Sequence, residues 1–157
     1  MKLTKEQTTL LKLKYGGCCA YCGILLGDRW QKDHIEPLVR IRRYVKDDEG
    51  RRIPLGKGKY QEEVIIENPD RDTYDNLNPS CAKCNNDKSS MSLERWRELI
   101  PHRVHTLNND PKYASYQKAK RFGLVVECDI PVVFWFERYE AISSLVAFMS
   151  RFPSIGT

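Results

Sequence analysis

The chain has 157 residues, 41% of them hydrophobic and 30% charged, which is typical of one soluble globular domain and excludes a disordered or fibrous protein. No apolar run approaches the ~20 residues of a membrane-spanning helix, and the N-terminus lacks the apolar stretch of a secretory signal, so we expect a cytoplasmic protein without a membrane partner. The formal net charge of +5 is compatible with a nucleic-acid partner but does not establish one.

The N-terminal half predicts a helix followed by a strand. A capping box at Thr4 and leucines at helical spacing predict a helix over about residues 5–14, which Gly16 ends. Residues 29–35 alternate in polarity and predict a strand that Pro37 stops.

The C-terminal half predicts helices and two further strands. A short helix is expected from Asn85, a second helix with Trp96 on its apolar face ends at Pro101, and a third runs over about residues 110–122. Residues 124–136 contain two β-rich stretches, and residues about 139–149 predict a final helix. With no repeat and no clear linker, the pattern favours a single α+β domain.

The positive charge is concentrated in one segment. Residues 38–59 contain eight Lys or Arg and three Asp or Glu, a surplus as large as that of the whole chain. Such a run is either a solvated loop or a nucleic-acid-binding surface. Its glycines and prolines favour a flexible hairpin or a partly ordered loop, with residues 62–67 returning as a strand.

Four of the six cysteines form two pairs with Cys-x-x-Cys spacing, Cys19 with Cys22 and Cys81 with Cys84. Each pair places two sulfurs on a tight turn, and four thiolates together make a closed tetrahedral zinc site. Because no ligand position stays open for water, we expect this zinc to be structural. The 58 residues between the pairs exceed the spacing of a compact zinc finger, so an insertion is expected there.

Other interpretations of the cysteines remain open at this point. A thioredoxin-like redox pair and a coincidence of buried thiols compete with the zinc site. Cys18 can replace Cys19 as a ligand, although Cys19 gives the matched spacing. Cys128 is expected to be a small core residue.

Around these cysteines the sequence resembles the HNH nucleases. The resemblance covers about residues 15–95 and is based on four stretches, Cys-Ala-Tyr-Cys-Gly at 19–23, Asp-His-Ile-Glu-Pro-Leu at 33–38, Asp-Asn-Leu at 75–77 and Cys-Ala-Lys-Cys-Asn-Asn-Asp-Lys at 81–88. Residues 132–137 are similar to phage and prophage members. The resemblance implies the ββα-metal fold, in which two strands and one helix surround a metal. Residues about 38–72 are then a basic insertion, and residues about 96–157 are a C-terminal α/β extension.

The resemblance also implies a role for each matched residue. His34 is the general base, Asp33 is a ligand of a catalytic metal, and Asn76 braces the loop that holds the histidine. Asn85 takes a position where many members have histidine, and it matches a subset in which asparagine is an oxygen ligand. Two oxygen ligands suit Mg²⁺ or Mn²⁺.

These roles predict a metal-dependent DNA endonuclease. Neutral His34 takes a proton from water, help that typically contributes ~10²- to 10⁴-fold, while the metal polarises the phosphate and stabilises the departing 3′ oxygen. Lys88 is either a phosphate contact or an ordinary surface lysine. Arg40, Arg42 and Arg43 follow the catalytic strand, and we expect them to grip the backbone of double-stranded DNA.

A rival hypothesis is a non-catalytic zinc-knuckle module that binds nucleic acid through the basic segment. Such a module needs the cysteines and arginines but not a base beside two oxygen ligands, so the residues favour the enzyme. One site cuts one strand per visit, and double-strand cleavage requires a homodimer or two visits. The sequence leaves oligomeric state, specificity and biological role open.

The aromatic residues at 96 and 134–136 are expected in the core, and His102 and His105 are expected on the surface.

Overall fold

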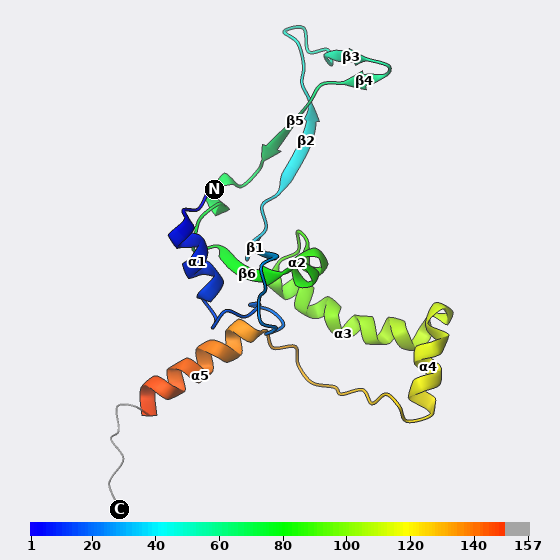
Figure 1. Cartoon of the computed structure of the whole chain (residues 1–157). Coiled ribbons are helices and arrows are strands. Elements are labelled where there is room, and N and C mark those ends of the chain that lie inside the picture. Colours follow the sequence, from blue (N-terminus) through cyan, green and yellow to red (C-terminus); the bar gives the residue numbers. More distant parts are fainter. Residues whose placement is uncertain (150–157) are drawn as a thin grey trace, which may run out of the picture.

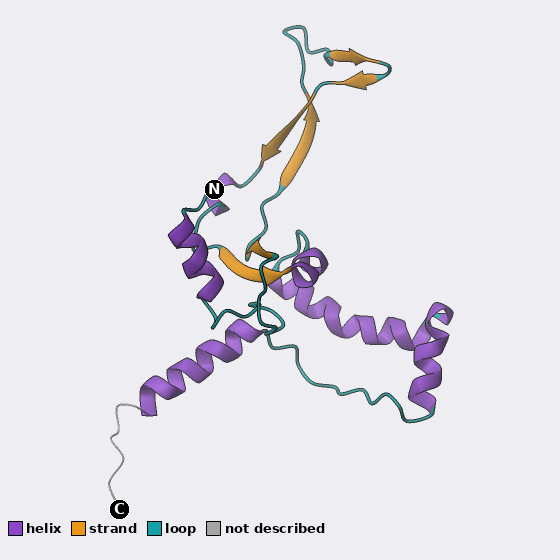
Figure 2. Ribbon diagram, viewed as in Figure 1, coloured by secondary structure: helices purple, strands orange, loops and turns teal. Residues whose placement is uncertain are grey.

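The computed structural model describes residues 1–149, which form an α+β arrangement of helices and two-stranded sheets (Figures 1 and 2). The helices are α1 (Lys5–Leu13), α2 (Ala82–Lys88), α3 (Leu93–Asn109), α4 (Ala114–Arg121) and α5 (Trp135–Met149), with short 3-10 turns at Pro69–Arg71 and Pro111–Tyr113. The strands are β1 (Trp30–His34), β2 (Arg40–Tyr44), β3 (Pro54–Gly56), β4 (Lys59–Tyr60), β5 (Glu62–Ile66) and β6 (Leu77–Cys81).

Strands β1 and β6 form the small sheet at the centre of the molecule. They pair antiparallel, with Trp30 opposite Cys81 and His34 opposite Leu77. Helix α2 follows β6 without a loop, because Cys81 ends the strand and also caps the helix by accepting a hydrogen bond from the Cys84 N–H. The predicted strand and the short helix are both present, the helix starting three residues earlier than predicted. This arrangement sets β1 beside α2.

An aromatic cluster joins the N-terminal and C-terminal parts of the chain. The Trp96 ring of α3 stacks on Phe134 at 5.1 Å between ring centroids, and Tyr21 packs edge-on against both rings. The backbone N–H groups of Trp135 and Phe136 donate to the carbonyls of residues 21 and 20. The segment before α5 therefore lies on the loop that carries the first cysteine pair.

The basic insertion forms a projecting β ribbon, here named the β arm (residues 40–66). Strands β2 and β5 pair antiparallel with Arg40 opposite Ile66, and β3 and β4 form a smaller hairpin at the far end, away from the body of the molecule (Figure 1). The Asn68 side chain closes the base, since it accepts from the Val39 N–H and donates to the Pro37 carbonyl. The insertion is thus a hairpin, and the returning strand at residues 62–67 is confirmed.

Helix α3 continues through Pro101, so the predicted end of this helix is wrong. A proline inside a helix removes only one backbone hydrogen bond, and packing can offset that loss. Here the far half of α3 lies against α4, and the Gln117 side-chain amide donates to the carbonyls of Leu107 and Asp110 at the end of α3. Tertiary contact thereby extends the helix beyond the local stop signal.

The predicted strands within residues 124–136 are absent from the structure, which has an extended connection over residues 124–134 and the start of α5 at residue 135. Leu124 and Val126 are more than 80% exposed, so their β-propensity has no partner strand to satisfy. Cys128 is exposed and is not the core residue predicted.

Helix α5 starts four residues earlier than predicted, because the Glu137 carboxylate accepts from the Phe134 N–H at its first turn. Within residues 1–149, helices long and apolar enough to cross a membrane are absent.

The aromatic cluster should dominate the stability of the chain. Phe134 is 2% exposed, so we expect Phe134→Ala to lower the free energy of unfolding by about 3–5 kcal/mol through lost burial and the cavity it leaves. Urea denaturation followed by tryptophan fluorescence measures the change. Phe122 is 76% exposed, and Phe122→Ala is the matched control, with an expected change within about 0.5 kcal/mol. Equal losses in both variants would contradict this account of the core.

Candidate functional site

The two cysteine pairs meet in one cluster. The sulfur atoms of Cys19, Cys22, Cys81 and Cys84 all lie within 4.8 Å of one another, and the Cys22 and Cys81 sulfurs are 3.9 Å apart. Zinc–sulfur bonds of about 2.3 Å in a tetrahedron require sulfurs about 3.8 Å apart. The donor set and its size therefore fit a four-thiolate zinc ion. Cys18 is outside the cluster, with its thiol directed at the Gly16 carbonyl.

Backbone N–H groups already point at the clustered sulfurs. The Cys81 N–H donates to the Cys19 sulfur at 3.3 Å, and the Cys84 N–H donates to the Cys81 sulfur at 3.5 Å. A hydrogen bond from the Cys84 thiol lowers the pKa of Cys19 to about 4, and the same bond raises the pKa of Cys84. Hydrogen bonds from the backbone favour thiolates, which are the form that binds a metal.

Gly23 lets the first cysteine pair turn tightly against the C-terminal segment. Its φ of +74° is in the left-handed region, and a Cβ at this position would lie 3.1 Å from the Trp135 ring. The glycine N–H also donates to the Cys19 carbonyl, which closes the turn. Glycine is therefore required both by backbone conformation and by close packing.

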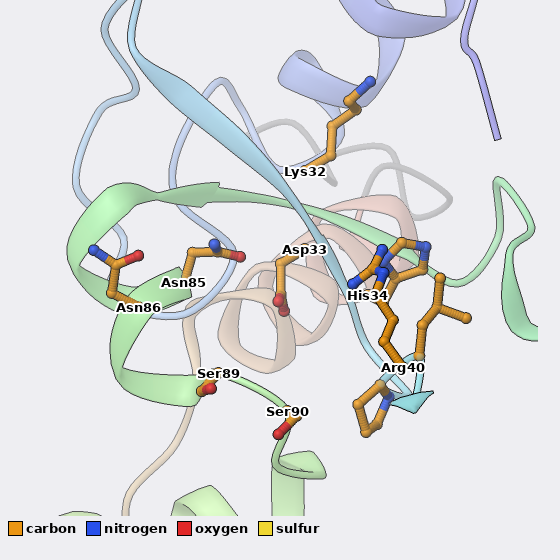
Figure 3. A pocket seen from close by; sticks show the side chains of 10 residues that line it. Lys32, Asp33, His34, Arg40, Asn85, Asn86, Ser89 and Ser90 are labelled. Carbon is orange, nitrogen blue, oxygen red and sulfur yellow. The ribbon is translucent and has the colours of Figure 1, made fainter. Parts of the chain in front are cut away.

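An open pocket of about 600 Å³ lies beside the central sheet and collects four of the eight predicted catalytic and nucleic-acid-binding residues. Asp33 and His34 come from β1, Asn85 from α2 and Arg40 from the start of β2 (Figure 3). The other lining residues were not predicted, and they are Lys32, Pro37, Leu38, Asn86, Ser89 and Ser90. The sequence pattern could have predicted Lys32 at this site, because a residue two positions before His34 in a strand lies on the same face as His34.

Asp33 is only 5% exposed, and two neighbours hold its carboxylate. The Tyr21 hydroxyl donates to Oδ2, and the Lys88 Nζ lies 3.1 Å from the same oxygen. Both contacts use Oδ2, and Oδ1 has no hydrogen bond or ion pair among the described residues. Burial is the largest influence and raises the pKa of Asp33 overall, although the Tyr21 hydrogen bond and the Lys88 charge lower it in part. The two partners thus offset some of the desolvation cost of the charged form.

Lys88 has a different position from the one predicted. Its side chain is fully buried, and its ammonium group donates to the His34 carbonyl at 2.6 Å in addition to pairing with Asp33. Because the side chain is fully buried, Lys88 is not the surface lysine of the one alternative, and the structure gives no support to the phosphate contact of the other. A buried ammonium needs a paired carboxylate, which is the role that Asp33 fills.

The His34 imidazole is held by a carboxylate that was not predicted. Its Nε2 lies 3.0 Å from Oδ1 of Asp72, in the turn after the β arm. Hydrogen bonds from the Met1 amino group and from His34 lower the pKa of Asp72, so this carboxylate is ionised at neutral pH. The sequence gives no signal for the contact, because 38 positions separate the two residues and the arm lies between them.

Asn76 holds the chain that follows His34. Its side-chain oxygen accepts from the Glu36 N–H at 2.8 Å, and its amide donates to the carbonyls of Glu36 and Arg71. Its own carbonyl accepts from the Ile35 N–H. These bonds join the end of β1 to the turn that carries Asp72, so Asn76 fixes the backbone on both sides of the histidine contact.

The three predicted arginines have different surroundings. Arg40 lines the pocket, whereas Arg42 and Arg43 lie farther along β2 on opposite faces of the strand. Arg43 is paired with Glu63 at 2.7 Å, and an ion pair for Arg42 is absent from the described residues. His102 and His105 stack on the surface of α3, outside the pocket.

Comparisons with protein-family models, curated proteins and solved structures found no match for this chain.

The cysteine cluster makes a direct prediction about metal content. We expect the purified chain to hold about one zinc ion per molecule by mass spectrometry of metal content, and Cys84→Ser to lose it because a tetrahedral site needs all four ligands. Cys128→Ser is the matched control, since this cysteine is exposed and outside the cluster. A wild-type chain that takes up no zinc, even when zinc is added during refolding, contradicts the site.

Proposed function

We propose that this chain is a metal-dependent endonuclease of the HNH type that hydrolyses phosphodiester bonds in DNA. One observation carries the proposal: a base candidate and two oxygen ligands, His34, Asp33 and Asn85, line one open pocket although they come from two distant segments. The cysteine cluster supports this convergence, because one half lies a short loop before β1 and the other half is at the start of α2. The expected ββα arrangement agrees with the pairing of β1 with β6 and the position of α2.

His34 acts in this proposal as the general base. With its Nε2–H donated to Asp72, the other ring nitrogen, Nδ1, has no hydrogen-bond partner among the described residues and can accept a proton from water. The Asp72 carboxylate fixes the ring orientation and stabilises the imidazolium that forms when the proton is taken. Asn76 keeps the backbone of this contact in place.

Asp33 and Asn85 are the residues that would hold the catalytic cation. Their carboxylate and amide oxygens suit Mg²⁺ or Mn²⁺, and the free Oδ1 of Asp33 leaves one carboxylate oxygen for this purpose. When bound, such a cation supplies charge stabilisation to the phosphate and to the departing 3′ oxygen. Tyr21 and Lys88 orient Asp33 by binding the other oxygen of its carboxylate, Oδ2. Arg40, at the rim of the pocket, is placed to bind a neighbouring phosphate.

Cleavage of plasmid DNA tests the proposal. We expect the zinc-loaded chain to nick or cut supercoiled plasmid in the presence of Mg²⁺ or Mn²⁺, and His34→Ala to reduce cutting by about 10²-fold or more because the base is lost. Zinc content and DNA binding should stay unchanged in this variant. His105→Ala is the matched control, since this histidine is exposed on α3 outside the pocket.

Two results would count against the enzyme. Equal cutting by wild type and His34→Ala would exclude the histidine as the base. DNA binding without any cutting across Mg²⁺ and Mn²⁺ would favour the non-catalytic binding module instead.

The Asp72 contact gives a second, independent test. Asp72→Asn preserves the shape of the side chain but removes the charge that stabilises the imidazolium, so we expect kcat to fall by about 10-fold or more with little change in KM. The control is Asp70→Asn, an exposed carboxylate in the same turn. An Asp72→Asn variant with wild-type kcat would remove Asp72 from the mechanism.

A further inference from the structure

The β arm is built as a free-standing ribbon. All five residues of β2 and three of the five in β5 are exposed, and the pairing of β2 with β5 is the arm's main support (Figure 2). Ordering the backbone of an exposed ribbon costs conformational entropy, and burial of a hydrophobic core does not offset that cost. The arm therefore has a purpose other than stabilising the domain.

Contacts between side chains stiffen the far end of the arm. The Arg52 guanidinium lies 4.2 Å from the centre of the Tyr44 ring and 5.8 Å from that of Tyr60, and the two rings pack edge-on. The backbone adds order, since the Val45 N–H donates to the Gln61 carbonyl and the Ile53 N–H donates to the Val45 carbonyl. The tip, residues 46–60, thus has a defined shape before any partner binds.

Much of the positive charge on the arm is free of ion pairs. Arg43 and Arg51 are neutralised, the first by Glu63 and the second by Asp47 and Glu49. Six other cations of the arm have no ion pair among the described residues: Arg40, Arg42, Lys46, Arg52, Lys57 and Lys59. Unpaired cations along a ribbon match the repeating phosphates of a nucleic-acid backbone.

The arm and the pocket share one residue, which sets where a substrate lies. Arg40 lines the pocket and is also the first residue of β2, and Arg42 continues along the same face of the strand. A phosphodiester held in the pocket is therefore next to the base of the ribbon. A duplex that extends from the pocket in the direction of β2 passes along the arm.

We infer that the β arm enters the major groove of the double-stranded DNA whose backbone is bound at the pocket. The groove of B-DNA that admits a two-stranded ribbon is the major one, about 12 Å wide, whereas the minor groove is about 6 Å wide. The inference relies on the proposed nuclease function for the position of the DNA, and it adds the form of the substrate, a duplex with an open major groove.

A tip deletion tests the contact. Because Val45 and Gln61 are hydrogen-bonded neighbours, an Asn-Gly turn can replace residues 46–60 and close the hairpin. We expect about 10-fold weaker binding to a labelled 30-base-pair duplex, measured by fluorescence anisotropy without divalent metal. The double variant Arg42→Ala with Lys57→Ala tests the same surface at full length, and its salt dependence should be shallower by about 0.9 for each lost phosphate contact. The double variant Arg95→Ala with Arg103→Ala, on α3, removes the same number of positive charges and is the charge-matched control.

The groove is tested with a modified duplex. Glucosylated 5-hydroxymethylcytosine fills the major groove with sugar, so the wild-type chain should bind such DNA about 10-fold more weakly than the plain duplex. The tip-deleted variant should bind both duplexes alike. Equal binding of both duplexes by the wild type, or tighter binding of the single strand than of the duplex, would overturn the inference.

Failure of the arm and failure of the nuclease are separable. Wild-type affinity in the tip-deleted variant and in Arg42→Ala with Lys57→Ala would overturn the role of the arm, whatever the cleavage assay shows. Arm-dependent, groove-sensitive binding by a chain that cuts no DNA would uphold the arm and contradict the proposed function alone.

Discussion

The contact on which the rest of the structure depends is the meeting of four cysteine sulfurs from two distant segments. Residues 19–22 and 81–84 are separated by 58 residues, yet their sulfurs lie within 4.8 Å of one another. A short loop joins the first pair to the strand that carries Asp33 and His34, and the second pair is at the start of the helix that carries Asn85. Joining the sulfurs therefore assembles the pocket, and the intervening chain is free to extend as the β arm.

The buried ion pair of Asp33 with Lys88 fixes the part of β1 that lines the pocket. A carboxylate and an ammonium in a dry interior are tolerable only as a pair, and Asp33 with Lys88 satisfies that requirement at 3.1 Å. The pair also fixes the orientation of its neighbours. Lys88 donates to the His34 carbonyl, and Tyr21 donates to the Asp33 carboxylate oxygen that Lys88 contacts. Two neighbouring residues of one strand are thus fixed by a single buried cation, an arrangement that suits a site needing stable geometry.

The sequence was informative where a signal is local and failed where tertiary contact decides. The capping box at Thr4, the cysteine spacing and the strand at residues 29–35 are local patterns, and the structure contains all three. The contact of His34 with Asp72 and the burial of Lys88 depend on how the arm and α2 return to β1, which no spacing records. The extended segment at residues 124–134 shows the converse, since β-propensity without a partner strand produces no sheet.

The most direct test of the account is the chemistry of the DNA ends. If His34 activates water and a cation held by Asp33 and Asn85 stabilises the departing 3′ oxygen, each cut leaves a 5′-phosphate and a 3′-hydroxyl. Products made by the zinc-loaded chain with Mn²⁺ should therefore be rejoined by DNA ligase without prior enzymatic treatment. Absence of cutting, or ends with a 3′-phosphate that ligase cannot join, would contradict the account.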